Sequence, residues 1–377
     1  MHSYEWKFEF LVAKSMITHF LLGLLCVFLA AVGGWSKSHK VTIGLLGFVF
    51  FLIFAFSALR YDFGNDYLSY IDIFNDSKYL DTSDFSKYDG HSELGWVLLC
   101  WLFQPLGFFW MVAVLALFNS IVYYRFLVKY CPKEYYWLAV FIYIFSTNNM
   151  LVQLSAMRQA VAVSIFIISI DFLLKKQVLK YLVLIYFATW FHSSVIIVSL
   201  LIFLPFLQLK NNKYSLFLVI SLYFSSYFIA QDVSLMLNNY IVPFLGQYDV
   251  YQDAGVVSSG LGLITLSMIF LFMMFSTLSL SKKDMLIVKI GAISFMIIPF
   301  SLLVMMIARI SMYFQAALIV AIPLAVMSVK NKLIRALFLI PFIIFTLYGY
   351  FTFFASPIYH QKFNIYHTVF SDVVANF

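Results

Sequence analysis

The chain has 377 residues, of which 63% are hydrophobic and only 11% are charged. Soluble proteins carry about a quarter charged residues, so this composition excludes a soluble fold and indicates an integral membrane protein. The formal net charge of +7 would suggest a nucleic-acid partner in a soluble protein, but in a membrane protein it reports how the loops are oriented. We therefore expect no nucleic-acid partner. We also expect one transmembrane domain over residues 1–377, since the sequence shows no repeat, low-complexity segment or linker.

Runs without Asp, Glu, Lys or Arg locate the membrane crossings, because charged side chains are costly in hydrocarbon. A single crossing needs about 20 apolar residues. In chain order, the segments that we interpret as single crossings are Ser15–Ser36, Val41–Leu59, Tyr135–Met157, Arg158–Leu174, Tyr214–Gln231, Ser258–Ser281, Met285–Ile307, Ile310–Val329 and Ala336–Ala355.

Two further windows are too long for one crossing. Leu94–Tyr124 is interrupted by Gln104-Pro105-Leu106-Gly107, a helix-breaking sequence. It predicts a re-entrant half-helix near Glu93–Leu102, followed by a full helix. Tyr181–Leu209 carries His192 near its middle, which fits either one tilted helix or two short helices with a turn at His192.

The distribution of charge favours the turn at His192. With the turn, one side of the membrane holds sixteen cations and three acids, a net charge of +13, and the other holds eight cations and fourteen acids, a net charge of −6, which together give +7. This bias satisfies the positive-inside rule, whereas a single helix would move the Lys282 and Lys330 clusters outside. The sequence thus predicts an all-α polytopic protein with about 11–12 transmembrane helices plus re-entrant or half-helices. Both termini are expected outside, with outward loops over residues 60–93 and 232–259.

Three arginines run against this charge bias. Arg60 ends one helix, Arg158 begins another, and Arg309 is expected in a tight turn between Ile307 and Ser311. Each alone is explained by snorkelling to lipid phosphate. Three at one face are better explained by an anionic ligand, and the planar guanidinium fork matches the oxygens of a pyrophosphate.

The segment after Arg60 contains further candidates. Asp66 and Tyr70 fall at helical spacing and could face Arg60 or a ligand, while Gly64 permits a close backbone turn. The alternative is that Asp62 and Asp66 cap an amphipathic surface helix, which we favour for Asp62.

Two other residues are candidates for acid–base chemistry. His192 is expected at the outward tip of the broken helix pair, where irregular backbone usually borders a cavity, and an imidazole there suits a general base. The alternative is a hydrogen-bonded structural histidine. Glu93 could cap the half-helix or bind sugar hydroxyls, and the sequence does not decide between these roles.

No metal site or cofactor is expected. Cys26, Cys100 and Cys131 form no CxxC pair and no Cys/His spacing suited to zinc or a cluster.

This set of residues resembles the EpsG-like branch of the Wzy-type bacterial polysaccharide polymerases. The matching pieces follow the family's order: Arg60 with Gly64, Asp66, Tyr67 and Tyr70, then Glu93-Leu94-Gly95-Trp96, Met157-Arg158-Gln159-Ala160, Phe191-His192-Ser193-Ser194, and Arg309 near Tyr313-Phe314. The chief departure is a bulky Tyr61 where the family has a smaller residue.

The resemblance implies a GT-C-like polymerase of the bacterial cytoplasmic (inner) membrane, with its active site facing the periplasm or cell exterior. Such an enzyme joins undecaprenyl-pyrophosphate-linked oligosaccharide repeat units into O antigen of lipopolysaccharide, capsule or exopolysaccharide. Its partners are the lipid-linked donor and acceptor, membrane lipid and, as a further candidate, a chain-length regulator protein. No DxD-like metal motif lies in an outward loop, which agrees with a metal-independent transferase.

The resemblance also suggests roles for residues. The candidates for activating the acceptor hydroxyl are His192, Asp66 and Glu93. The candidates for substrate binding, with the arginines on the pyrophosphate, are Arg60, Arg158, Arg309, Tyr67, Tyr70, Gln159 and Tyr313.

Two other functions share some of these features. An O-antigen ligase uses the same chemistry with a lipid A core acceptor, and the sequence leaves it open. A lipid-linked oligosaccharide flippase or other transporter would place charges along a path through both leaflets. Here the candidate charges gather at one face, which favours surface chemistry.

Overall fold

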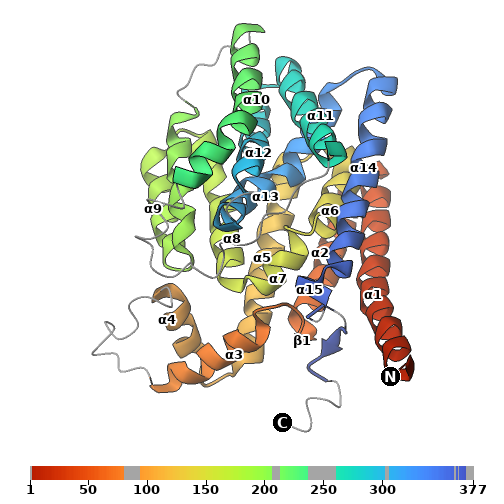
Figure 1. Cartoon of the computed structure of the whole chain (residues 1–377), viewed down its shortest axis with the longest axis vertical. Helices are drawn as coiled ribbons and strands as arrows, with labels where there is room; N and C mark the ends of the chain where they lie inside the picture. The colour runs from red at the N-terminus through yellow and green to blue at the C-terminus, as the bar shows by residue number, and fades with distance from the viewer. Residues whose placement is uncertain are drawn as a thin grey trace. The chain divides into compact units, whose positions relative to one another are not determined.

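The computed structural model describes residues 2–79, 94–205, 213–236, 260–301, 305–360, 362–363 and 365–370. These residues are almost entirely helical (Figure 1). Eight of the described helices are long and apolar enough to cross a membrane, and four more apolar helices are shorter. The prediction of an all-α polytopic membrane protein is therefore confirmed.

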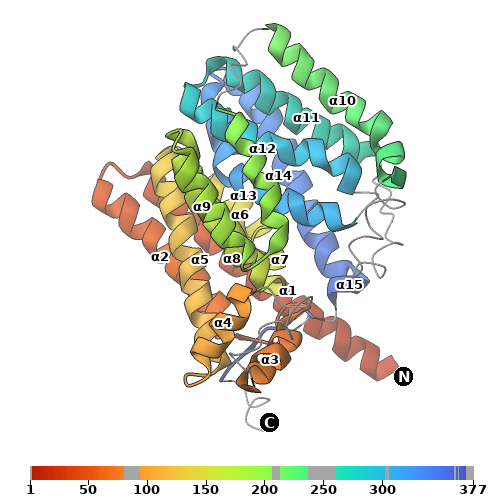
Figure 2. The same cartoon turned by 90° about the vertical axis from the view of Figure 1, so that its left-hand side faces the viewer.

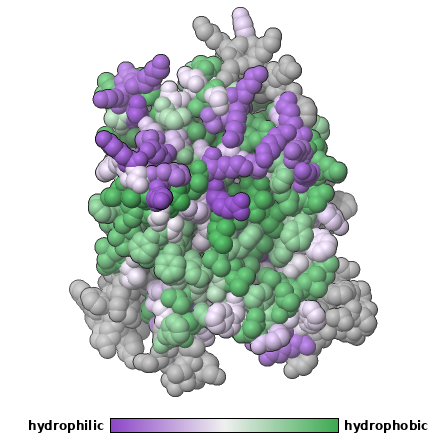
Figure 3. Space-filling view, turned by 180° about the vertical axis from the view of Figure 1, so that it is seen from behind, coloured by the Kyte–Doolittle hydropathy of each residue, from purple (hydrophilic) through white to green (hydrophobic). Residues whose placement is uncertain are grey.

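Large apolar side chains are exposed along these helices, among them Phe28, Phe217 and Leu337. Apolar residues cover much of the face drawn in Figure 3. Such a surface would be unfavourable in water and suits lipid.

The chain divides into two compact units, which we describe separately. Unit 1 comprises Met1–Ser169, Leu182–Ile196 and Thr346–Phe377, and unit 2 comprises Ile170–Tyr181 and Ile197–Phe345. In unit 1, α1 (His2–Trp35) packs against α2 (His39–Leu59) and α6 (Tyr136–Phe145), and α2 packs against α5 (Phe108–Tyr130). Glycine permits one close approach: a Cβ on Gly34 would lie 2.3 Å from the carbonyl oxygen of Lys133.

The chain leaves α2 at Arg60, where the backbone becomes extended. Here β1 (Arg60–Tyr61) pairs antiparallel with β2 (His367–Thr368), with Tyr61 opposite His367. A turn then leads into α3 (Tyr67–Asp76) and the 3₁₀ turn η1 (Ser77–Tyr79).

The predicted half-helix is present as α4 (Leu94–Phe103), and α5 follows after a break. The break has a clear cause: Gly107 adopts φ +92° and its amide donates to the carbonyl of Phe103 (2.8 Å), ending α4. Gln104 in the break donates to the Ser77 hydroxyl (2.7 Å), which ties α4 to the end of α3. Both helices lie at one end of α5 (Figures 1 and 2).

The predicted crossing over Tyr135–Met157 is not one continuous helix. After the 3₁₀ turn η3 (Lys133–Tyr135), α6 ends at Phe145, and the chain continues as α7 (Met150–Ser155) and α8 (Met157–Leu174). The intervening Ser-Thr-Asn-Asn segment is uncharged, so the charge-free window did not detect it. These side chains compete with the backbone for hydrogen bonds, as Asn149 does by donating to the carbonyl of Ile142 (3.4 Å).

The predicted turn at His192 is confirmed. Helix α9 (Val178–Thr189) ends just before it, and the 3₁₀ helix η4 (Ser193–Phe203) follows. The amide of His192 donates to the carbonyl of Ala188 (3.1 Å) and closes the last turn of α9. The Tyr181 hydroxyl donates to the carbonyl of Val198 (2.5 Å), so η4 runs back beside α9.

Unit 2 contains α10 (Lys213–Met236), α11 (Gly260–Ser276), the 3₁₀ turn η8 (Thr277–Ser279), α12 (Lys282–Ser301), α13 (Met305–Ser328) and most of α14 (Lys332–Ala355). Its most extensive helix pair is α12 with α13. A Cβ on Gly291 would lie 2.9 Å from the Cβ of Ala321, so glycine allows this pair to pack closely. Most of the predicted outward loop over residues 232–259 lies outside the described residues.

The prediction of a tight turn at Arg309 is wrong. Helix α12 ends at Ser301 and α13 already begins at Met305, so Arg309 lies within a helix. The prediction failed because it placed the helix boundary at the charge. An arginine near a helix end can direct its guanidinium toward the interface without ending the helix.

Candidate active site

Arg60 is a buried structural junction. Its side chain is 3% exposed, and its guanidinium donates to the carbonyl of Leu154 (3.3 Å) and to that of Ser57. The guanidinium carbon lies 5.6 Å from the centre of the Tyr67 ring, and the Tyr67 hydroxyl donates back to the Arg60 carbonyl (3.1 Å). Arg60 thus joins the end of α2 to α7 and α3.

Burial lowers the pKa of Arg60 to about 10, and Tyr67 and Tyr366 oppose this shift. The side chain therefore stays cationic at neutral pH. It is too enclosed to reach a ligand at the surface, so its geometry favours a positioning role.

A small polar cavity of about 30 Å³ lies beside Arg60, between α2 and α5–α8. Its polar lining includes Asn119, Ser120, Tyr143 and Gln153. The Gln153 amide donates to the Tyr123 hydroxyl (2.8 Å), while Arg60 Nε and Gln153 Oε1 are buried without a hydrogen-bond partner. Because buried polar atoms are usually satisfied, often by water, we expect this cavity to be hydrated.

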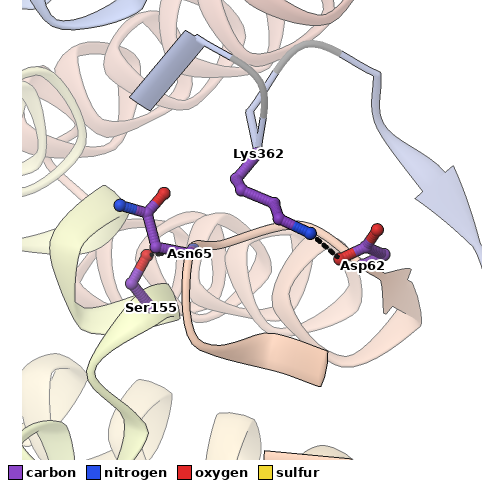
Figure 4. Close-up of polar contacts among 4 residues, drawn as sticks. All are labelled: Asp62, Asn65, Ser155 and Lys362. Carbon is purple, nitrogen blue, oxygen red and sulfur yellow. Dashed lines mark hydrogen bonds and ion pairs between the residues drawn. The ribbon is translucent and has the colours of Figure 1, made fainter. Parts of the chain in front are cut away.

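The turn after Arg60 is fixed by its backbone and by its neighbours (Figure 4). Gly64 adopts φ +124°, and a Cβ there would lie 3.1 Å from the Leu154 carbonyl oxygen, which confirms the predicted close turn. The amide of Asn65 donates to the Ser155 hydroxyl (2.9 Å). Asp62 adopts φ +45° and pairs with Lys362, at 3.5 Å between Oδ1 and Nζ.

The capping role that we favoured for Asp62 is therefore wrong. Asp66 occupies the N-cap position of α3, although its side chain makes no capping hydrogen bond. That side chain is exposed, so the carboxylate of Asp66 is accessible to a ligand.

Arg158 is the more accessible of the two candidate site arginines in unit 1, since Arg60 is buried. It lies in the first turn of α8, is partly exposed, and places its guanidinium carbon 5.8 Å from the centre of the Tyr70 ring. Burial raises the pKa of Tyr70, the positive charge of Arg158 lowers it, and Asp66 raises it. The structure thus brings Asp66, Tyr70 and Arg158 together, as their spacing suggested for Asp66 and Tyr70.

Helix α4 connects this cluster to the turn that carries His192. Trp96 is fully buried and packs on Tyr70, with ring centroids 4.9 Å apart. The amide of Gly95 donates to the carbonyl of Trp190 (2.8 Å), and a Cβ on Gly95 would lie 2.9 Å from that oxygen. His192 is partly exposed two residues further on. The motifs that contain Arg60, Gly95, Arg158 and His192 therefore meet at one end of unit 1.

The remaining predicted site residues have different surroundings. Tyr67 (1% exposed) and Gln159 (3% exposed) are buried in unit 1, which favours positioning roles for both. Tyr313 is fully buried and Arg309 partly exposed in unit 2, so their proximity to Arg158 stays a prediction. Glu93 lies outside the described residues.

The sequence analysis missed the C-terminal segment, which contributes Lys362 beside Asp62, Tyr359 near Asp66 and Tyr366 near Arg60. The segment gives almost no local signal, because its strand has only two residues and its packing partners are about 300 positions away in the sequence. Within the described residues, no three His, Cys, Asp or Glu side chains gather into a group that could hold a metal ion.

Comparison with known proteins gives one match. A family model described as the EpsG family matches residues 43–368, which is most of the chain. The searches of curated proteins and of solved structures each returned no match.

Proposed function

Because the chain belongs to the EpsG family of polysaccharide polymerase-like membrane proteins, we propose that it polymerises undecaprenyl-pyrophosphate-linked oligosaccharide repeat units. One observation carries the proposal: a partly exposed guanidinium, Arg158, lies beside Tyr70 and Asp66 at the end of unit 1 that also carries the His192 turn. Glycosyl transfer from a pyrophosphate carrier requires a cation that stabilises the leaving group and a base that activates the acceptor hydroxyl. This face carries candidates for both.

The proposed reaction breaks the bond between the anomeric carbon of the donor chain and its pyrophosphate oxygen. The bond electrons leave with the pyrophosphate, and Arg158, assisted by Arg309, stabilises the negative charge that develops there. An acceptor hydroxyl forms the new glycosidic bond and transfers its proton to a base, for which His192, Asp66 and Glu93 are the candidates. If the reaction inverts configuration, base and leaving group lie on opposite faces of the donor sugar.

Burial separates binding roles from positioning roles. We assign direct contact with substrate to Arg158 and Asp66, whose side chains are accessible, and positioning to Arg60 and Tyr67, whose side chains are buried. Tyr70 orients the Arg158 guanidinium through its ring face.

We further propose that the protein lies in the bacterial cytoplasmic membrane with this face directed outward. The charge asymmetry of the sequence supports this orientation, since the predicted opposite side carries most cations. The product would be O antigen, capsule or exopolysaccharide, and a chain-length regulator is a candidate partner. The metal-independent chemistry predicts that EDTA leaves polymer formation unchanged.

Surface glycan from a deletion strain complemented with variants tests the proposal. We expect Arg158→Ala, Arg309→Ala and His192→Ala proteins to insert normally but to yield only single-repeat glycan. Wild-type chain lengths in all three would contradict the proposal. In the deletion strain itself, accumulation of unligated long polymer would instead identify a ligase, and lipid-linked repeats confined to the inner leaflet would identify a flippase.

A further inference from the structure

The described C-terminal residues 357–360, 362–363 and 365–370, which we call the C-terminal strap, lie against the turn that follows α2. The strap comprises α15 (Pro357–His360) and β2. Backbone hydrogen bonds hold it at both ends of the turn: the amide of Val369 donates to the carbonyl of Leu59 (3.0 Å), and the amide of Gly64 donates to the carbonyl of Lys362 (3.1 Å). The pairing of β1 with β2 lies between these two bonds.

Aromatic side chains anchor the strap. Phe363 is fully buried, and its ring centroid lies 4.9 Å from that of Phe63. Tyr366 stacks on Phe56 at 4.2 Å and donates its hydroxyl to the Phe56 carbonyl (2.6 Å). The strap is therefore packed into unit 1 rather than lying loosely on its surface.

The strap also reaches the polar groups of the candidate site. Lys362 pairs with Asp62, and both side chains are about one-third exposed, at 36% and 33%. An ion pair that is this exposed adds little stability, but it can orient the backbone of the turn. Burial and the charge of Asp66 raise the pKa of Tyr359, so Tyr359 lies within electrostatic range of that carboxylate.

The turn needs such support. Between Arg60 and Asp66 it has only the two residues of β1 in regular structure, and Asp62 and Gly64 both adopt positive φ. Conformations of this kind persist where surrounding structure holds them. The strap contacts this turn directly, from Leu59 to Gly64.

We propose that the C-terminal strap completes the active site, and that Lys362 is a positioning residue that acts through Asp62 to hold Asp66 toward the substrate. This inference rests on the proposed polymerase function. It assigns a role to residues far in sequence from every motif that indicated that function.

A double-mutant cycle tests the role of Lys362. Lys362→Met and Asp62→Asn each remove the ion pair, and Asn tolerates the positive φ at position 62. We expect each variant to lower kcat of the purified protein by about tenfold with little change in KM for the donor, and the double variant to lose no more than either single variant. Lys362→Arg should restore most of the activity.

Additive losses in the double variant would overturn the proposed coupling, because Lys362 would then act on the substrate directly. A selective rise in KM with unchanged kcat would overturn it for the same reason. Unchanged kcat and KM after removal of residues 357–377 would overturn the role of the strap as a whole.

A disulfide cross-link tests the docking without relying on activity. Tyr61→Cys and His367→Cys lie opposite each other across the two strands and should form a disulfide that preserves turnover. The control pair, Tyr61→Cys with Thr368→Cys, places the second thiol on the other face of the strand and should not form one. A cross-link that fails to form, or that forms and abolishes activity in a folded protein, would contradict a permanently docked strap. If the wild-type protein makes no polymer while the cross-link still forms, the proposed function fails and the docking stands.

Discussion

Single residues in unit 1 separate into those that can meet a substrate and those that hold them in place. Arg60 and Arg158 have the same side chain and are both predicted at the outward face, yet their surroundings differ. The guanidinium of Arg60 donates hydrogen bonds to backbone carbonyls inside the protein, whereas Arg158 lies partly exposed over an aromatic ring. Sequence could identify both arginines as exceptions to the charge bias, but not this difference, because it depends on contacts between α2 and α7.

Arg60→Met should therefore act first on stability. The change leaves the buried carbonyls of Ser57 and Leu154 without their donor, which costs about 1–3 kcal/mol per unsatisfied group. We expect the variant to have a lower Tm in detergent, as measured by tryptophan fluorescence during thermal unfolding. A variant with wild-type Tm that has lost activity would instead indicate direct contact between Arg60 and the substrate.

Gly64→Ala tests the turn itself. The φ of +124° and a contact of 3.1 Å from the new Cβ to the Leu154 carbonyl oxygen predict destabilisation by about 1–3 kcal/mol. Gly44→Ala is the matched control, since nothing lies within 4 Å of its Cβ. Equal unfolding temperatures for the two variants would show that the turn carries no strain.

At the scale of elements, α4 is the part that joins the Tyr70 cluster to the His192 turn. The amide of Gly95 in α4 donates a hydrogen bond to the carbonyl of Trp190, and this close contact leaves no room for a side chain at position 95. Docking of a short helix at a membrane face is the kind of contact that fixes the geometry of catalytic groups.

Gly95→Ala should therefore lower activity while the protein still inserts. The new methyl group would lie 2.9 Å from the Trp190 oxygen, so α4 and the His192 turn must move apart. We expect kcat to fall about tenfold or more, measured on membranes with equal protein content. Leu94→Ala, which removes an exposed side chain one residue earlier, should have little effect. A fully active Gly95→Ala protein would show that this contact does not position the site.

Segments without charged residues predicted most of the helices correctly, because charged side chains are costly in hydrocarbon. The break before α5 and the turn at His192 followed from Pro, Gly and the charge balance. The break at Ser146–Asn149 was missed because its residues are polar but uncharged, and the Arg309 turn was wrong because a charge does not by itself end a helix. The C-terminal strap was missed because two-residue strands and aromatic packing between residues about 300 positions apart leave almost no local pattern.

At the scale of the whole molecule, eight long and four shorter apolar helices in the described residues indicate a multi-pass membrane protein. The orientation that we propose rests on the predicted asymmetry between +13 on one side and −6 on the other, derived from the sequence. The same asymmetry made the few outward cations stand out as candidates.

This orientation predicts which residues are accessible in cells. A cysteine at Asp66→Cys should react with a membrane-impermeant maleimide in intact cells, and one at Lys129→Cys should react only after lysis. The native Cys26, Cys100 and Cys131 are buried and should give little background. The reverse pattern of labelling would place the candidate site in the cytoplasm and contradict the proposed outer-face chemistry.

The central claim is that Arg158 serves glycosyl transfer from a lipid pyrophosphate, and polymer formation by the purified protein tests it most directly. The protein would be supplied with defined lipid-linked repeat units in detergent, without any ion gradient. The wild-type protein and Arg125→Ala, a control at another exposed arginine, should convert the repeats into polymer. Arg158→Ala should lower kcat/KM by about a hundredfold or more at unchanged Tm. Polymer formation by Arg158→Ala at the wild-type rate, or no polymer from the folded wild-type protein, would contradict the account.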